Sequence, residues 1–412
     1  TAVGFRIMVL SNSQWWAATG EDSYSIEGSG LFDASKYIDR TPSSVTTDKL
    51  WTFSTWVKLT DLGADNTLIS GWLAAASTPY CHIGINAADQ LSLVTPGSTV
   101  ALTTNKVFRD YGAWYHILVI YDSDSDAASD RIRFWVNGVQ ETSFSTENQP
   151  SSSANSMLIS TSYPMQLGRN GFNAAMVYSH LYQTETALIE GTAYSASSFG
   201  EFDSNGVWVP IDITGLTFGT NGFLFASGTD IAAGTDSSGE GNNFAVVSAP
   251  TVFNDSPTDS GDYGNYATFN PLIQGSLCTL SNGNLTATGN SVSNNGSVAF
   301  TQYVEDGGLY YYEITMTTVV SEYPYPGVIE HPGEAWINTS GIATSSATLG
   351  GFHAQAGATN IKMNIRGVYT AAWGADPWAN GDIVTIAIDD ANGAVYLGSN
   401  ASGSLVWQNS GD

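Results

Sequence analysis

The stretch WYHILVIYDSDSDAASDRIRFWVNGV, residues 114–139, decides the fold class of this chain. Its first eight residues are apolar on both faces of an extended backbone, which predicts a central strand between two layers. In the second apolar run, Phe134 and Val136 alternate with Arg133 and Trp135, the two-residue period of a half-buried strand. That run ends at an Asn-Gly pair, residues 137–138, and both residue types tolerate the positive φ of a type I′ turn. The stretch therefore predicts two strands and a tight turn.

The rest of the chain repeats this pattern of short strands and turn residues. Trp51 to Leu59, Gly308 to Thr317 and Asp382 to Asp389 read as strands. A brief helical turn is predicted near Thr184 to Ile189, and no longer helical period is present. The sequence therefore predicts an all-β protein of two jelly-roll-like antiparallel β-sandwiches. Further Asn-Gly turns fall at Asn170-Gly171, Asn205-Gly206, Asn221-Gly222, Asn282-Gly283, Asn295-Gly296, Asn380-Gly381 and Asn392-Gly393.

Composition and charge narrow the possible partners. The 412 residues are 42% hydrophobic and only 12% charged, with 12 Lys and Arg against 38 Asp and Glu, a net charge of −26. Binding to nucleic acid needs clustered Lys and Arg to neutralise phosphates, and the sequence has no such cluster. The same sign disfavours anionic membranes, and no apolar run reaches the roughly 18 residues that span a bilayer. We therefore expect neither nucleic-acid binding nor membrane insertion.

A length of 412 residues suits two domains and a connector. We expect a first sandwich over residues 1–218, a connector over 219–270 and a second sandwich over 271–412. The connector is rich in Gly, Asp, Asn and Ser, yet Phe223-Leu-Phe225 and Phe244-Ala-Val-Val247 read as strands within it. We therefore expect it to be structured and to pack on the first domain. Cys81 and Cys278 are expected to be free, mostly buried thiols.

The first 200 residues or so resemble a concanavalin A-like, laminin-G-type lectin sandwich. The motifs that carry the resemblance are Trp51-Thr-Phe-Ser-Thr-Trp-Val-Lys58, Trp114-Tyr-His-Ile-Leu-Val-Ile-Tyr121 and Arg131-Ile-Arg-Phe-Trp-Val-Asn-Gly-Val139. Asp236-Ser-Ser-Gly-Glu-Gly-Asn-Asn243 also resembles a turn of that superfamily. The resemblance implies a lectin-like fold, and the fold by itself does not fix an activity.

The second half resembles a SPRY-type sandwich through Gly308-Leu-Tyr-Tyr-Tyr-Glu313, Gly341-Ile342, Gly381 to Asp389 and Gly393-Ala-Val-Tyr396. Thr385 departs from the family near a position where glycine is frequent. The resemblance also implies closing strands after Asp412, so we expect a truncated sandwich or a sheet completed by another chain. The pairing of modules, with the joining segments Asn254-Asp-Ser-Pro257 and Thr268-Phe-Asn-Pro-Leu272, is similar to structural proteins of marine bacteriophages.

Sugar binding needs an exposed aromatic ring beside polar groups. Trp373-Gly-Ala-Asp-Pro-Trp378 offers two indoles with Asp376 between them, and the alternative is that both indoles cap the sandwich core. Tyr323 and Tyr325, in a Pro-containing segment, form a second candidate, and the alternative is a contact between subunits. The predicted ligand-binding residues are therefore Trp373, Asp376, Trp378, Tyr323 and Tyr325.

The loop between the two strands quoted first carries four carboxylates that alternate with small residues. Such a loop would gather oxygen ligands for Ca²⁺, the one cofactor that the sequence suggests, and the alternative is a solvated acidic loop tip. No carboxylate pattern typical of glycanases is present, so no catalytic residue is predicted. The predicted calcium ligands are Asp122, Asp124, Asp126 and Asp130.

The missing glycanase pattern predicts a non-enzymatic protein, and the resemblance to phage structural proteins implies a virion surface protein, a fibre or an appendage. It would present lectin-like modules to host-surface glycans or to other virion proteins. Symmetric display as a homo-oligomer, such as a trimer, would strengthen weak single sites. The alternatives are a glycan-cleaving depolymerase on a concanavalin-like fold and a cellular surface adhesin.

Overall fold

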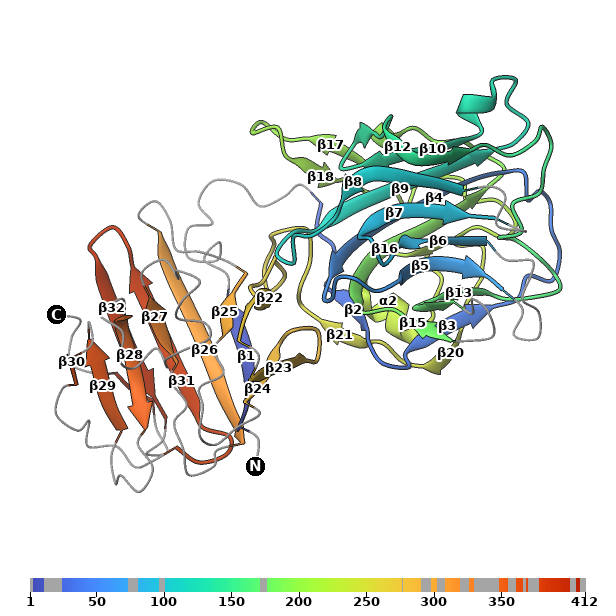
Figure 1. Cartoon of the computed structure of the whole chain (residues 1–412). Helices are drawn as coiled ribbons and strands as arrows, with labels where there is room; N and C mark the ends of the chain where they lie inside the picture. The colour runs from blue at the N-terminus through green and yellow to red at the C-terminus, as the bar shows by residue number, and fades with distance from the viewer. Residues whose placement is uncertain are drawn as a thin grey trace. The chain divides into compact units, whose positions relative to one another are not determined.

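The computed structural model describes residues 3–10, 24–72, 81–95, 101–170, 176–275, 277–289, 298–301, 308–318, 326–329, 348–354, 361–365, 368–369, 378–400 and 405–407. The chain divides into two compact units. The insert unit is Gly20–Asn265, and the flanking unit combines Thr1–Thr19 with Tyr266–Asp412 (Figure 1). Both units consist mainly of antiparallel sheets, which confirms the predicted all-β class. No helix among the described residues is long and apolar enough to cross a membrane.

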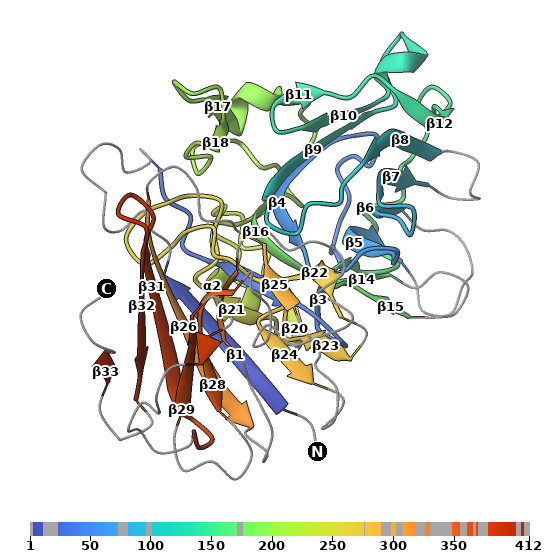
Figure 2. The ribbon, with the colours of Figure 1, turned by 60° about the vertical axis from the view of Figure 1, so that its left-hand side comes forward.

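The insert unit contains two large sheets, which we name B and C (Figure 2). Sheet B consists, in spatial order, of β11 (Val139–Gln140), β10 (Ile132–Val136), β9 (Tyr115–Asp122), β4 (Leu50–Leu59), β16 (Leu181–Glu190), β2 (Ser29–Phe32) and β21 (Thr251–Phe253), and β19 (Phe223–Phe225) also pairs with β16. Sheet C consists of β12 (Phe144–Asn148), β8 (Ala101–Val107), β7 (Gln90–Val94), β6 (Cys81–Ile85), β5 (Asn66–Gly71), β13 (Met165–Leu167), β3 (Tyr37–Arg40) and β20 (Ala245–Ser248). Two small hairpins join β14 (Arg169–Asn170) to β15 (Val177–Tyr178) and β17 (Gly200–Phe202) to β18 (Trp208–Pro210), and the one described α-helix is α2 (Gly228–Ala233).

The core of the insert unit follows from alternation along its strands. Side chains of a strand point to opposite faces in turn. Trp51 and Phe53 of β4 lie in one buried cluster with sheet C side chains such as Ile83, and Trp51 stacks on Tyr121 at 5.4 Å between ring centroids. Trp56, of opposite parity, lies in a second cluster on the outer face of sheet B. Sheet B is therefore buried on both faces.

The hairpin predicted from residues 114–139 is present. Strands β9 and β10 pair antiparallel, and Val136 lies opposite Val139 across the turn. Asn137 and Gly138 have φ values of 48° and 75°, as a type I′ turn requires. A Cβ atom on Gly138 would lie 2.2 Å from the Trp208 ring, so the turn also needs glycine for space.

The helical turn predicted near residues 184–189 is wrong. These residues belong to β16, whose ten residues are all buried between β4 and β2. The pairing with β4 shifts register between Thr184 and Ala187, and Glu185 within the shift has a φ of 37°. Because the strand is buried on both faces, it lacks the polar–apolar alternation that would identify it.

The segment expected to be a connector belongs to the insert unit as far as Asn265. Its strands β19, β20 and β21 pair with β16, β3 and β2. The loop Asp236–Asn243 is closed internally, because the Asp236 carboxylate accepts hydrogen bonds from the backbone N–H groups of Leu224, Ser238 and Asn242. This segment thus completes both large sheets.

The flanking unit contains a sheet that we name A. Sheet A consists of β23 (Cys278–Ser281), β24 (Thr286–Gly289), β1 (Val3–Leu10), β26 (Leu309–Thr318), β31 (Ile383–Asp389), β32 (Ala394–Ser399) and β33 (Val406–Trp407). A further sheet consists of β27 (Gly327–Ile329), β28 (Thr348–Ala354), β29 (Ile361–Ile365) and β30 (Val368–Tyr369), and β22 (Phe269–Gln274) pairs with β25 (Val298–Phe300). A buried cluster that includes Tyr312, Ile386 and Trp378 forms its core.

The position of β1 corrects the expectation that the first domain begins at residue 1. Strand β1 lies between β24 and β26, with Arg6 opposite Thr286 on one side and Thr315 on the other. The N-terminal strand therefore belongs to the same sheet as residues 278–407, and the insert unit lies between two parts of the flanking unit in sequence. Cys81 and Cys278 are free and buried, as predicted.

Candidate functional site

The outer face of sheet B is filled by the chain itself. Residues after β16 place Phe199, Trp208 and Phe218 over this face, where they form one buried cluster with Trp56 and Leu118. We call residues 192–222 the cover. Because every one of these large side chains is at most 8% exposed, none of them offers an aromatic platform to a ligand.

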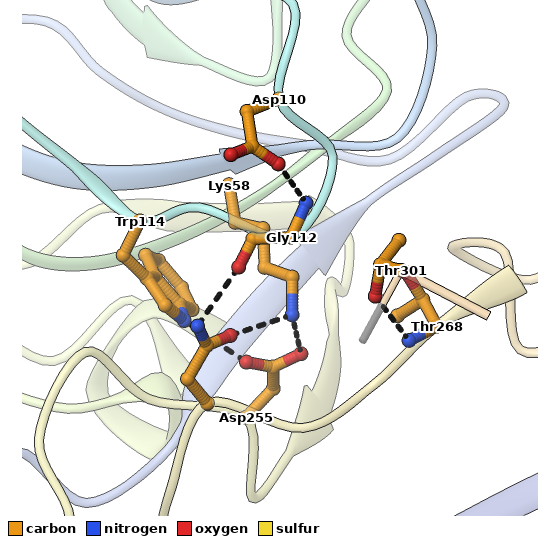
Figure 3. Close-up of polar contacts among 8 residues, drawn as sticks. Lys58, Asp110, Gly112, Trp114, Asp255, Thr268 and Thr301 are labelled. Carbon is orange, nitrogen blue, oxygen red and sulfur yellow. Dashed lines mark hydrogen bonds and ion pairs between the residues drawn. The ribbon is translucent and has the colours of Figure 1, made fainter. Parts of the chain in front are cut away.

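A buried ion pair ties the segment after β21 to the same face (Figure 3). Lys58 Nζ of β4 lies 2.8 Å from Asp255 Oδ2 and 2.9 Å from Asn265 Oδ1. The second oxygen of Asp255 accepts a hydrogen bond of 2.9 Å from Trp114 Nε1. Asn265 Nδ2 donates to the Gly112 carbonyl at 2.8 Å. Lys58 is fully buried, and its two partners, Asp255 and Asn265, offset part of the cost of removing its charge from water.

A buried histidine supports the cover from below. Trp208 Nε1 donates to His116 Nδ1 at 3.1 Å, so the ring proton lies on Nε2, which is 2.9 Å from Ser54 Oγ. Burial lowers the pKa of His116 to about 3. The imidazole is therefore neutral at physiological pH and joins the cover to β4 and β9 as a structural group.

The outer face of sheet C is polar. Asp39, Gln166, Ser70 and His82 lie opposite one another across β3, β13, β5 and β6, so their side chains share one face. Ile38, the neighbour of Asp39 in sequence, points into the core. The β14–β15 hairpin packs beside β5 and adds Arg169 and Tyr178, which are directly opposite each other.

Five residues form what we call the sheet C cluster: Tyr37, Asp39, Gln166, Arg169 and Tyr178. The Arg169 guanidinium lies over the Tyr37 ring at 3.3 Å, and the rings of Tyr37 and Tyr178 are 6.3 Å apart. Arg169 Nε donates to Gln166 Oε1 at 3.2 Å. Stacking and the hydrogen bond fix the plane of the guanidinium, while both tyrosines remain half-buried.

Polar groups of the cluster retain hydrogen-bonding capacity. Arg169 Nη2 lies 3.9 Å from Asp39 Oδ2, an ion-pair distance that is too long for a hydrogen bond. Among the described residues no hydrogen bond reaches the Asp39 carboxylate. Burial raises the pKa of Asp39, and the Arg169 charge lowers it in part. An acceptor and a donor therefore face each other without a direct hydrogen bond between them.

The arrangement suits binding of polar, uncharged groups more than catalysis or metal binding. Asp39 is the one acid within the cluster, and Arg169 beside it would repel a cation. Within the described parts of the chain, no three His, Cys, Asp or Glu side chains are placed to hold a metal ion. A sugar offers hydroxyls to the Asp39–Arg169 pair and a C–H face to a tyrosine ring.

None of the sugar-binding residues predicted from the sequence is a member of the sheet C cluster. Trp373, Asp376, Tyr323 and Tyr325 fall outside the described residues. Trp378 is 4% exposed, and its Nε1 donates to Ser399 Oγ at 3.0 Å. Its ring packs in the core of the flanking unit, which is the alternative that the sequence left open, and it presents no face to a ligand.

The loop with the four predicted calcium ligands does not form a metal site. Asp122 is half-buried, whereas Asp124, Asp126 and Asp130 are exposed. Ser153 Oγ donates to Asp124, and the last three residues of the loop form a 3₁₀ turn (Ala128–Asp130). No three acids of the described residues are placed to hold a cation, which agrees with the alternative of a solvated acidic loop tip.

No motif in the sequence marks the sheet C cluster as a site. Its one local signal is the alternation of Tyr37 and Asp39 around the apolar Ile38, which places both on the outer face of a strand. Arg169 and Tyr178 come from a hairpin about 130 residues later, and only strand order brings them together.

Comparison with known proteins supports the fold of the insert unit. A family model described as the concanavalin A-like lectin/glucanases superfamily matches residues 32–186. This match supports the predicted concanavalin A-like, laminin-G-type domain in that part of the chain. No curated protein matches the sequence.

Solved structures give distant matches. A putative carbohydrate binding protein from Bacteroides ovatus is 13% identical over 47% of this chain and 73% of its own, with a TM-score of 0.29. Domains LG4-5 of the mouse laminin alpha1 chain are 11% identical over 95% of this chain and 80% of their own, with a TM-score of 0.34. A Ruminococcus gnavus sialidase CBM40, bound to alpha2,3 sialyllactose, is 15% identical over 41% of this chain and 88% of its own, with a TM-score of 0.29. At these similarities nothing about ligands is transferred.

Proposed function

We propose that this chain is a non-catalytic glycan-binding protein and that the sheet C cluster of its insert unit is the binding site. The observation that carries the proposal is the Asp39–Arg169 pair, 3.9 Å apart, beside two half-buried tyrosine rings. The Asp39 carboxylate and Arg169 Nη2 have no hydrogen bond among the described residues, and hydroxyls of a sugar would satisfy both. A rigid guanidinium would set their geometry before the ligand arrives.

The direct test is binding of the full chain to a panel of immobilised glycans, with Arg169→Gln as the variant. We expect the wild-type chain to bind a subset of the glycans and Arg169→Gln to bind none of them. The substitution removes both the hydrogen-bond donor and the guanidinium that stacks on Tyr37. Lys106→Gln is a matched control, since it also removes a cation from an ion pair, with Glu141, at the other end of sheet C. Equal binding by Arg169→Gln and wild type, both with unchanged melting temperatures, would exclude the cluster.

The setting that we propose is the surface of a phage particle, where the chain acts as a fibre or an appendage. The support is the sequence resemblance of its two modules to structural proteins of marine bacteriophages. The SPRY-like nature of the flanking unit belongs to the same proposal. Its motifs at residues 308–313 and 382–389 lie in adjacent antiparallel strands, β26 and β31. Detection of the chain in purified particles, beside capsid or tail proteins, tests this setting, and its presence on a cell surface alone would favour an adhesin.

Display on a particle would also compensate for a weak single site. Several copies in a symmetric homo-oligomer, such as a trimer, bind a glycan-coated surface with an avidity far above the single-site affinity. We expect monovalent sugar to compete poorly with immobilised glycan.

A depolymerase remains the competing function. Glycan hydrolysis needs two carboxyl groups about 5–9.5 Å apart, and Asp39 is the single acid of the cluster. Incubation of the full chain with the glycan that it binds, followed by a reducing-end assay, distinguishes the two. We expect no new reducing ends, and their appearance would identify an enzyme.

A further inference from the structure

We infer that Asp39 restricts the sheet C cluster to uncharged glycans with neighbouring hydroxyl groups and excludes acidic sugars. The inference rests on the proposed function and concerns the class of ligand. It starts from the fact that the cluster contains an arginine, the residue that ordinarily attracts carboxylates and sulfates.

Three contacts limit what Arg169 can offer an anion. One face of its guanidinium lies on the Tyr37 ring, at 3.3 Å. Its Nε donates to Gln166. The Nη2 edge faces Asp39 Oδ2 at 3.9 Å, so the position that an anionic ligand would take already lies beside a carboxylate. An incoming carboxylate or sulfate would meet the Asp39 charge at short range.

The surrounding charges reinforce this exclusion. Lys36, one residue before Tyr37, is paired with Asp33 at 2.8 Å, and its Nζ also donates to Thr251. Arg40 contacts Asn242, and the charges of Asp236 and Glu190 act on it. Lys36 is therefore paired with a carboxylate, Arg40 lies in the field of two others, and the chain as a whole carries a net charge of −26. A polyanionic glycan would be repelled both at a distance and at the site.

An uncharged diol fits the same geometry. One hydroxyl can donate to Asp39 while its oxygen accepts from Arg169, and a neighbouring hydroxyl can use the second Asp39 oxygen. Both interactions are charge-assisted, which gives them strength without a charge on the ligand. The half-buried Tyr178 ring then lies beside the site for the C–H face of the sugar.

The test compares the full-length wild type with Asp39→Asn on matched neutral and acidic glycans, for example a neutral oligosaccharide with and without a terminal sialic acid. Asn keeps the size of the side chain and one acceptor oxygen but removes the charge. We expect the wild type to prefer the neutral glycan by about tenfold or more, which corresponds to about 1.4 kcal/mol. In Asp39→Asn we expect weaker binding of the neutral glycan and stronger binding of the acidic one.

Glu141→Gln is the control, because it also removes one acid from an ion pair, with Lys106 at 2.9 Å, and changes the net charge equally. Its ratio of neutral to acidic binding should equal that of the wild type. Arg169→Gln provides a second variant, which should lose the neutral glycan without gaining the acidic one. Melting temperatures establish that each variant is folded.

The outcomes separate the inference from the function. A wild type that binds no glycan overturns both. A wild type that binds acidic glycans as well as neutral ones overturns the inference and leaves the function intact. An unchanged ratio in Asp39→Asn does the same, because Asp39 would then play no part in selection.

Discussion

Lys58 and Asp255 are 197 residues apart in sequence, and Lys58 Nζ lies 2.8 Å from Asp255 Oδ2 in the interior of the insert unit. The pair joins the central strand β4 to the segment that follows the last strand of sheet B. It therefore closes the outer face of that sheet, which is one reason why the proposed site lies on sheet C.

Asp255→Ala should strongly destabilise the insert unit. The change leaves Lys58 charged and buried and removes the acceptor of Trp114 Nε1. We expect a loss of about 3–5 kcal/mol in the free energy of unfolding, measured by urea denaturation. Lys58→Met together with Asp255→Leu should recover part of the loss, since no unpaired charge remains. Glu141→Gln breaks the more exposed pair with Lys106 and should cost no more than about 1 kcal/mol. A similar loss in both single variants would contradict the account.

Acid should weaken the insert unit through His116. Burial lowers its pKa from 6.5 to about 3, so the unfolded chain binds a proton between these values and the folded chain does not. The stabilisation is complete above pH 6.5 and is lost as pH falls toward 3, by about 1.4 kcal/mol for each pH unit. His116→Phe keeps a ring but cannot titrate. We expect it to be less stable at neutral pH, since Trp208 and Ser54 lose a partner, and to show a shallower acid decline. If the stability of the wild type and of His116→Phe falls equally steeply with acid, His116 is not the cause of the decline.

Glu185 should produce the opposite dependence. Neither of its oxygens has a hydrogen bond in the described structure; Tyr24 and Trp56 are near enough to lower its pKa but lack hydrogen-bond geometry. Burial raises the pKa from 4.5 to about 8, with a smaller upward contribution from Asp212. The folded state therefore holds a proton that the unfolded state releases, and stability is full below pH 4.5 and falls as pH rises toward 8.

The contribution of Glu185 can be measured separately between pH 6.5 and 8, because His116 is neutral there in both the folded and the unfolded chain. In this window the wild type should lose about 1.4 kcal/mol for each pH unit, and Glu185→Gln should show no such decline. Glu190→Gln is the control, since the buried Glu190 carboxylate accepts hydrogen bonds from the Thr46, Thr47 and Asn221 backbone. Glu190→Gln should lower the free energy of unfolding but leave its dependence on pH the same as in the wild type. A wild-type slope near zero would mean that Glu185 is charged in the folded protein.

Removal of residues 1–10 should unfold the flanking unit and spare the insert unit. Strand β1 pairs with both β24 and β26, so its loss removes on the order of ten hydrogen bonds, each worth about 1 kcal/mol net. That sum is comparable with the whole stability of a domain, about 5–15 kcal/mol. Hydrogen exchange should become fast in residues 309–318 and remain slow in residues 115–122. Unchanged protection of 309–318 would show that β1 is dispensable.

The sequence predicts local features of this fold well. The hairpin of residues 114–139 is readable because its alternation and its Asn-Gly turn lie within one short segment. Strand β16 is misread because burial on both faces removes the alternation. The place of β1 depends on pairing with strands about 280 residues away, for which a single sequence holds no local signal.

The candidate binding sites show the same difference between features that lie within one segment and features that depend on distant strand pairing. Aromatic residues in a Gly- and Pro-containing segment suggest a platform for sugar binding, yet Trp378 is buried. The prediction is wrong for this residue because a sequence does not show which aromatic rings pack in the core. The Asp39–Arg169 pair joins β3 of sheet C to the separate β14–β15 hairpin, which packs beside β5, and its members are individually ordinary. Residue types can therefore suggest sugar binding, while topology determines which residues meet.

Calorimetric titration of the full chain with a glycan selected from the panel, for the wild type and Tyr178→Ala, measures whether the sheet C cluster holds the glycan. We expect the wild type to bind and Tyr178→Ala to bind about tenfold or more weakly, because the half-buried ring beside Arg169 is lost. Phe202→Ala, which removes a 52% exposed ring from the β17–β18 hairpin, should leave the affinity unchanged. Equal affinities for wild type and Tyr178→Ala, with both proteins folded, would contradict a glycan site on the outer face of sheet C.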